Sequence, residues 1–117
     1  MQTYKDLIAW QKSIELAIQI YVLTKEFPSD ERYGLTSQMR RAAVSISSNI
    51  AEGKLRGSQK EYCHFLRIAF GSGGELETQI EIARRLPYTS DLSYQKVDTL
   101  LNEVMRMLNV MIAKAKS

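Results

Sequence analysis

Three glycines within four residues, Gly71, Gly73 and Gly74, are the part of this chain whose composition most suggests phosphate chemistry. Glycine-rich turns bind phosphates because their backbone N–H groups can approach the anion closely. The known phosphate-binding loops follow a strand, and they have the spacing GxGxxG or a lysine after the last glycine. The segment IAFGSGGELETQ, residues 68–79, has neither that spacing nor that lysine. Its role therefore depends on whether the surrounding residues form a loop or a helix.

Histidine and cysteine do not form a pattern that is typical of a catalytic or metal site. The single histidine, His64, is adjacent to the single cysteine, Cys63, and adjacent side chains on a helix point in different directions. The chain has no HxxxH or CxxC spacing. We therefore expect a surface histidine, a half-buried cysteine, no cofactor, no metal and no enzymatic activity.

Three carboxylates, Glu75, Glu77 and Glu81, resemble a di-iron carboxylate set at first sight. That type of site needs a Glu-x-x-His motif from each of two helices, which a chain with one histidine cannot supply. We expect these acids to form ion pairs with Arg84 and Arg85 on the same helix.

Basic residues are concentrated in the middle of the chain. Residues 36–60 contain five basic residues and one acid, Glu52, for a net charge of 5 − 1 = +4, which exceeds the +3 of the whole chain. Arg40, Ser47 and Lys54 recur every seven residues and define a stripe about 20 Å long on a helix. Cations and hydroxyls are donors to phosphate oxygens, although a solvated charged face has the same pattern. The predicted nucleic-acid-binding residues are Arg40, Arg41, Ser47, Lys54, Arg56 and Lys60.

Helical periodicity organises the whole chain. Apolar residues recur at intervals of three and four in four segments, which predicts helices near residues 4–26, 36–53, 59–86 and 93–115. Thr3 with Asp6, and Ser58 with Glu61, resemble capping boxes; Pro28 and Pro87 end two helices; Ser90 or Ser93 caps the last. Short connections predict an all-α fold, an antiparallel up-down-up-down four-helix bundle that forms one domain over residues 1–117.

The glycines can now be interpreted. Placing Gly73 between the apolar residues on either side gives the unbroken series 62, 66, 69, 73, 76, 80 and 83. A loop would have no reason to preserve that phase, so we predict a continuous helix. Three interior glycines weaken a helix by roughly 3 kcal/mol relative to alanine. Gly73 could offset this cost by letting a neighbouring helix or the Trp10 ring approach; a tolerated defect is the alternative.

More apolar residues are present than one bundle core requires. In the first helix we place Leu7, Trp10, Ile14, Ala17 and Tyr21 in the core. A second apolar stripe, together with phenylalanines of the third helix, then faces outward, and large exposed apolar patches indicate an interface. We therefore predict a homo-oligomer. Its predicted interface residues are Leu16, Ile20, Leu23, Phe65 and Phe70.

Asn49 lies in the predicted core seam of the second helix. A polar residue there needs a hydrogen-bond partner, and a buried asparagine can fix the register of a helical assembly. With one cysteine, no apolar signal core and no long apolar segment, we expect a cytoplasmic protein with no membrane association.

The segments RYGLTSQMRRAAVSISSNIAEG and KEYCHFLRIAFGSGGELETQ, with LIAWQKSIEL near the start, resemble one known family. Its members are small bacterial four-helix bundle proteins, first noticed in intervening sequences of large-subunit (23S) ribosomal RNA genes and sometimes called ribosomal proteins. The resemblance covers essentially the whole chain and implies a homopentameric ring. It also implies similarity to the accessory protein of diversity-generating retroelements, whose basic surface contacts nucleic acid. One departure is Gly73-Gly74, where family members more usually have small residues that are larger than glycine.

Two functions follow from these observations. In the first, the protein is an accessory factor that binds nucleic acid, structured RNA in particular, through the basic stripe. In the second, it is an oligomeric scaffold for another protein, and the basic face is solvated surface. Binding that weakens steeply with salt distinguishes the first from the second.

Overall fold

Helix-start and helix-stop residues divide the chain into four long helices in the computed structural model, which describes residues 2–116. They are α1 (Ile8–Thr24), α2 (Leu35–Arg56), α3 (Gln59–Arg85) and α4 (Gln95–Lys116). Two short 3-10 helices, η1 (Tyr4–Asp6) and η2 (Ser29–Glu31), precede α1 and α2.

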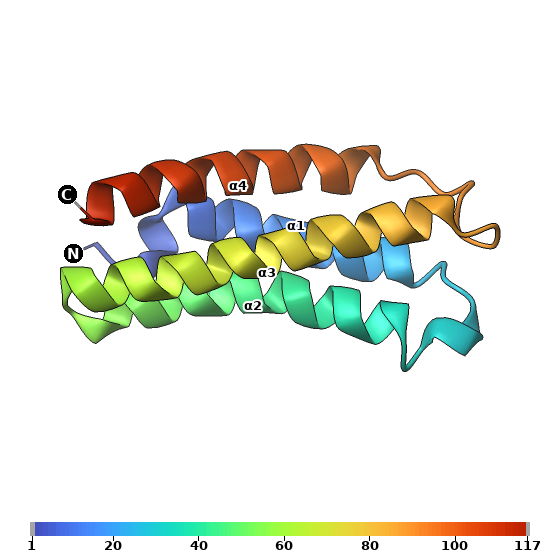
Figure 1. The fold of residues 1–117 in the computed structure, drawn as a ribbon, viewed down its shortest axis with the longest axis horizontal. Coiled ribbons are helices and arrows are strands. Elements are labelled where there is room, and N and C mark those ends of the chain that lie inside the picture. The colour runs from blue at the N-terminus through green and yellow to red at the C-terminus, as the bar shows by residue number, and fades with distance from the viewer. Residues whose placement is uncertain (1, 117) are drawn as a thin grey trace.

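Short connections make successive helices antiparallel, and the result is the predicted up-down-up-down bundle of 45 × 20 × 19 Å (Figure 1). Both α1 and α3 pack against α2 and α4, so each helix has two neighbours. Residues 2–116 contain no strand, and the all-α prediction is confirmed.

The predicted start signals are present, with small shifts in the helix boundaries. Thr3 and Asp6 form a full capping box, but it caps η1, and α1 begins only after Leu7. Ser58 Oγ accepts from the backbone N–H of Glu61 at 3.2 Å at the start of α3. The predicted caps of the last helix are wrong in position, because α4 begins at Gln95, beyond both serines.

The helix ends also follow local chemistry. Gly57 adopts φ = 85° after the last residue of α2, a left-handed conformation that glycine reaches at little cost. The helix α3 ends at Arg85, since Pro87 disfavours helical geometry at the residue before it.

The glycine run is helical, as its phase predicts: α3 is continuous from Gln59 to Arg85. Gly73 is buried against α4, where an added Cβ would overlap Met105 Sδ and lie 3.2 Å from Met105 Cε. Gly71 and Gly74 have no such neighbour within 4 Å. Gly73 therefore permits the close approach of a neighbouring helix, and the residue that uses the space is Met105, not Trp10.

The core of α1 lies on a different face from the one predicted. Leu16 and Ile20 have no exposed surface and Leu23 has 8%, whereas Tyr21 is 46% exposed. Two polar residues share this buried face and hide its apolar pattern: Ser13 donates to the Trp10 carbonyl at 2.7 Å, and Thr24 donates to the Ile20 carbonyl at 2.6 Å. The stripe predicted to face outward is therefore the core stripe.

In the other three helices the predicted phase is confirmed. The buried residues of α3 include Leu66, Gly73 and Ile80, and those of α4 include Leu101 and Leu108. Across residues 2–116, no helix is both long enough and apolar enough to cross a bilayer.

Asn49 of α2 is half-buried and bonds within its own helix. Its side-chain N–H groups donate to the Ser45 carbonyl at 2.8 Å and to Ser45 Oγ at 3.0 Å. Ser45 Oγ in turn forms a 2.8 Å hydrogen bond with Ser72 Oγ of α3. Asn49 thus finds the partner that a polar seam residue needs, and it takes part in a short polar link between α2 and α3.

Candidate functional site

The residues predicted to contact nucleic acid lie near the two ends of α2, not along one continuous exposed face. About 21 Å of helix, at 1.5 Å per residue, separates Arg40 from Lys54. Ser47, which the prediction places between them, is only 7% exposed, and its Oγ donates to the Val44 carbonyl at 3.1 Å. The predicted stripe is therefore wrong at its centre. Ser47 is on the same side of α2 as Arg40, and that side faces α1.

Arg40 is held against α1. Its Nε donates to Thr24 Oγ1 at 2.9 Å, and its guanidinium carbon lies 4.5 Å from the centre of the Tyr21 ring. Thr24 accepts this bond while it donates to a backbone carbonyl of its own helix. The bond to Thr24 uses only Nε of Arg40, so the two Nη groups keep donors for a further acceptor.

Arg40 is part of a basic hollow between the end of α1, η2 and the start of α2. The hollow has a volume of about 500 Å³. We call it the arginine hollow, and it is lined by Tyr21, Arg32, Tyr33, Thr36, Ser37, Arg40, Arg41 and Val44. Three arginines and two tyrosines thus line one hollow, and no aspartate or glutamate belongs to this lining within the described chain.

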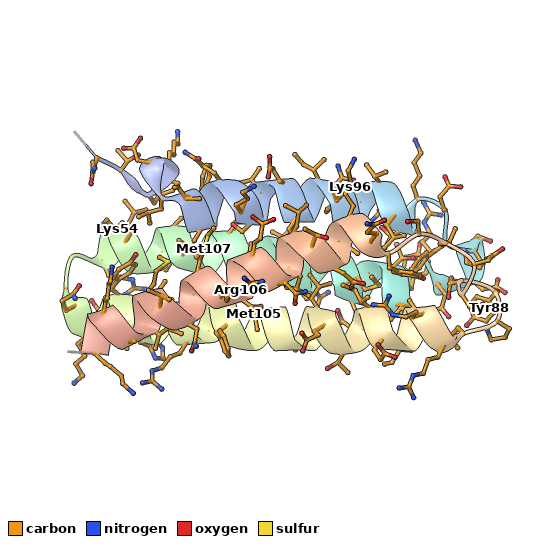
Figure 2. All side chains as sticks on the ribbon, turned by 90° about the horizontal axis from the view of Figure 1, so that it is seen from above. Lys54, Tyr88, Lys96, Met105, Arg106 and Met107 are labelled. Carbon is orange, nitrogen blue, oxygen red and sulfur yellow. The ribbon has the colours of Figure 1, made fainter. Side chains whose placement is uncertain are left out.

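The turn beneath the arginine hollow is fixed by Glu31. Its Oε1 accepts from the Leu35 backbone N–H at 3.0 Å, and its Oε2 accepts from the Tyr88 hydroxyl at 2.6 Å. The Tyr88 bond, followed by the Leu35 bond, lowers the pKa of the Glu31 carboxyl. Tyr88 lies in the connection between α3 and α4, so Glu31 joins two loops at this end of the bundle (Figure 2).

At the opposite end of α2, Arg56 is surrounded by carboxylates. Its Nε lies 2.8 Å from Glu52 Oε2, and its Nη1 lies 3.5 Å from Glu61 Oε1. The guanidinium carbon is also 4.9 Å from the centre of the Phe65 ring. Arg56 is therefore neutralised within the chain.

Lys54 and Lys60 lie near this second end but in different hollows. Lys54 Nζ is 5.4 Å from the centre of the Tyr62 ring, and burial raises the pKa of that phenol. Lys54 also borders a largely apolar groove of about 630 Å³ between the N-terminal segment and α4. Figure 2 places Lys54 and Tyr88 at opposite ends of the bundle. Lys60 lines a separate hollow with Arg67 and Lys116.

The predicted oligomer interface needs correction at three of its five residues. Leu16, Ile20 and Leu23 are in the bundle core, so they cannot contact another subunit. Phe65 is half-buried beneath Arg56, and Phe70 is 36% exposed. Other apolar side chains are more accessible than these, including Ile18 at 55% and Val22 at 58% on the outer face of α1.

The predicted pairing of Glu75, Glu77 and Glu81 with Arg84 and Arg85 is present within residues 2–116 only for Glu81. Glu81 pairs with Arg84 at 3.5 Å and with Arg85 at 2.9 Å, as predicted for that acid. The sequence has one Glu-x-x-His, from Glu61 to His64, but Glu61 pairs with Arg56 and His64 is exposed. Within residues 2–116, no group of three histidine, cysteine, aspartate or glutamate residues is placed to hold a metal ion.

Of the eight residues that line the arginine hollow, the sequence prediction includes only Arg40 and Arg41, and it misses Tyr21, Arg32 and Tyr33 in particular. Tyr21 was assigned to the core because the phase of α1 was wrong. Arg32 and Tyr33 precede α2 in the segment SDERYG, which lies between the first two predicted helices. The available signal is an arginine beside an aromatic residue in a turn, since loops supply many binding residues.

Comparison with known proteins identifies one family. A family model described as "23S rRNA-intervening sequence protein" matches residues 5–110. A similar solved structure is a crystal structure of a protein of unknown function from the S23 ribosomal protein family of Bacteroides thetaiotaomicron. The two structures have a TM-score of 0.80 and 25% sequence identity, over 90% of this chain and 98% of that chain. No curated protein matches.

Proposed function

Because the chain belongs to the 23S rRNA-intervening sequence protein family, we propose that it is a non-enzymatic, oligomeric protein that binds nucleic acid, with structured RNA as its target. The arginine hollow is the binding site. Arg32, Arg40 and Arg41 contact phosphate oxygens, and the bundle supplies a rigid support.

The observation that carries this proposal is the convergence of three arginines from two elements without a carboxylate among them. Each guanidinium carries five N–H donors in a planar arrangement that suits phosphate. Arg40 is held in place by Thr24 and Tyr21, so it loses less side-chain entropy on binding than a free arginine would. Phosphates carry no sequence information, so binding by these contacts is weakly sequence-specific.

The test is a titration of a labelled stem–loop RNA, followed by fluorescence anisotropy across a salt series. Arg40→Ala/Arg41→Ala should weaken binding about 100-fold, since each charge-assisted hydrogen bond contributes about 1.5 kcal/mol. The slope of log K against log salt should become shallower by about 1.5 to 2. Arg41→Ala alone, at an exposed position, should give about half of that change in slope.

The matched control is Lys5→Ala/Arg85→Ala, which removes the same charge at exposed positions outside the arginine hollow. Thermal unfolding by circular dichroism shows whether each variant is folded. If Arg40→Ala/Arg41→Ala binds the RNA as the parent does, the hollow is solvated surface. The scaffold function then replaces the proposed one.

Self-association is the second part of the proposal. Ile18 and Val22 lie one turn apart on the outer face of α1, and Phe70 and Ile82 are 36% and 47% exposed on α3. Burial of such side chains against another subunit removes apolar surface from water. The family resemblance predicts a ring of five subunits, and a ring would repeat the arginine hollow and increase the avidity for a long RNA.

Light scattering tests this part. We expect a closed oligomer at micromolar concentration and a lower mass for Ile18→Ser/Val22→Ser. Both side chains are exposed in the isolated chain, so the bundle itself should stay folded. A monomeric parent protein would rule out self-association, and the RNA titration would then report on a single hollow.

A further inference from the structure

Tyr33 has the most exposed ring among the large apolar and aromatic side chains in the described part of the chain, at 89%. It follows η2 and precedes Gly34 at the start of α2. An aromatic ring left in water forgoes the burial that normally makes such a residue stabilising. Tyr33 therefore contributes little to the fold through its side chain.

The backbone that carries this ring is nevertheless well fixed. The Arg32 N–H donates to the Ser29 carbonyl at 3.1 Å, and the Gly34 N–H donates to the Glu31 carbonyl at 3.0 Å. Glu31 is bonded in turn to α2 and to the Tyr88 hydroxyl. The ring thus projects from a rigid turn and not from a mobile loop.

The surroundings of Tyr33 are cationic and partly aromatic. The Arg32 guanidinium carbon lies 5.8 Å from the centre of the Tyr33 ring, on one of its faces. Arg40, Arg41 and the Tyr21 ring lie in the same hollow, whose volume of about 500 Å³ falls within the range of ligand-binding clefts, about 300–1,000 Å³.

We propose that the arginine hollow holds an unpaired nucleotide, with its base stacked on the free face of Tyr33 and its phosphate bonded to Arg40 and Arg41. This inference rests on the proposed function and adds the form of nucleic acid that the site accepts. An exposed ring beside arginines is the arrangement by which proteins hold single strands, because every base has a face that can stack.

Selectivity follows from the same geometry. In the interior of a duplex, both faces of each base are covered by neighbouring bases, so the Tyr33 ring can stack there only on a base that is already unstacked. In a structured RNA such bases occur in loops, bulges and ends. The hollow should therefore prefer single-stranded segments over duplex, whereas the arginines by themselves attract both.

The experiment compares two labelled RNA probes, a single strand and a blunt duplex of the same sequence, in anisotropy titrations at one salt concentration. Tyr33→Ala should weaken binding of the single strand about 5- to 150-fold, the range measured for one stacked base. Binding of the duplex should be unchanged. The salt slope should also be unchanged, because the substitution removes no charge.

Two variants serve as controls. Tyr33→Phe keeps the ring and should bind the single strand as the parent does. Leu55→Ala removes another large side chain, 72% exposed, from the opposite end of α2. It should change neither the affinity for the single strand nor the affinity for the duplex. Since the Tyr33 side chain is mostly in solvent, Tyr33→Ala should unfold at the same temperature as the parent.

The outcomes separate this inference from the proposed function. If Tyr33→Ala binds the single strand normally while Arg40→Ala/Arg41→Ala does not, the stacking inference is overturned and the proposed function stands. Equal weakening of the single strand and the duplex also overturns it, because neighbouring bases cover both faces of the interior paired bases that make up most of the duplex. If neither variant weakens binding, both proposals are overturned.

Discussion

The two ends of α2 carry similar numbers of cations but differ in what surrounds them. Near η2, Arg32, Arg40 and Arg41 line one hollow together with two tyrosine rings. Near the α2–α3 turn, Arg56 lies between Glu52 and Glu61. Positive charge in the sequence is therefore not by itself a binding site, because a carboxylate within hydrogen-bond distance satisfies the same donors that a phosphate would need.

The supports of the two ends differ as well. Polar bonds hold the η2 end, where Glu31 accepts from a backbone N–H and from the Tyr88 hydroxyl. Close packing holds the other end, where an added Cβ at Gly53 would lie 2.9 Å from Phe65 Cβ and 3.3 Å from the Tyr62 carbonyl oxygen. The first arrangement leaves side chains such as Tyr33 in solvent, while the second buries rings against helix backbone.

A carboxylate introduced into the arginine hollow should make the η2 end resemble the opposite end of α2. Val44 lines the hollow, is 42% exposed and lies four residues after Arg40, a spacing that suits an ion pair on a helix. Val44→Glu should weaken RNA binding at least about tenfold, because it neutralises one cation and repels phosphate. Anisotropy titration measures the effect.

The control for that variant is Val44→Gln, which has nearly the same size and no charge. It should retain most of the affinity of the parent. Equal losses of RNA affinity in the two variants would show that the shape of the side chain causes the effect. The electrostatic explanation of the difference between the two ends would then be wrong.

The packing of the second end predicts opposite effects of alanine at two glycines. Gly53→Ala should lower the free energy of unfolding by about 1 to 3 kcal/mol, because the new methyl group forces α3 away. Gly71→Ala should raise it by about 1 kcal/mol, since an added Cβ there meets no atom within 4 Å and alanine favours helix. Denaturant unfolding of the parent and both variants measures the pair. Equal changes in the free energy of unfolding would show that helix propensity, and not packing against α3, determines the effect at both positions.

Removal of the two carboxylates near Arg56 should make the second end of α2 more attractive to RNA. Glu52→Gln/Glu61→Gln should free Arg56 and increase RNA affinity severalfold, with a salt slope steeper by about 0.7 to 0.9 for one additional phosphate contact. The matched control, Glu75→Gln/Glu77→Gln, makes the same change of charge on α3, away from Arg56. If both double variants gain equally, net charge explains the result and position does not.

The smallest effect concerns the pH dependence of the η2 end. The pKa of Glu31 in the folded protein lies below its ordinary value of 4.5, because Tyr88 and the Leu35 N–H donate to the carboxylate. Glu31 therefore stabilises the fold fully above about pH 4.5, and this contribution is lost as the pH falls through the lowered pKa. Glu31→Gln should reduce the pH dependence of unfolding in that window. Chemical unfolding at several acidic pH values tests this.

Much of the fold could be predicted from local pattern. The series of apolar residues through Gly73 fixes α3 as one helix, and Gly57 and Pro87 mark where helices end. The prediction was wrong for α1, where apolar residues occupy most sides of the helix. Ser13 and Thr24 are buried there with their hydroxyls bonded to backbone carbonyls of the same helix, and such satisfied polar groups cannot be recognised from periodicity.

The candidate site was predicted less completely. Arg40 and Arg41 belong to the arginine hollow, as their charge suggested, but Ser47 is buried and Arg56 is paired. The pairing of Arg56 with Glu52 follows from an i, i+4 spacing and could have been read from the sequence. The contribution of Tyr21 could not, because it depends on how α1 is rotated about its own axis.

The four helices, their order and the inward faces of α2, α3 and α4 could be predicted from residue spacing, because they depend on the pattern along one helix. The rotation of α1 about its axis, and the hollow lined by Tyr21, Arg40 and Tyr33, depend on how the helices pack together. Helix formation depends on contacts within a few residues, whereas the hollow joins residues from two helices and a turn. Their distances are set by the packing of the whole bundle.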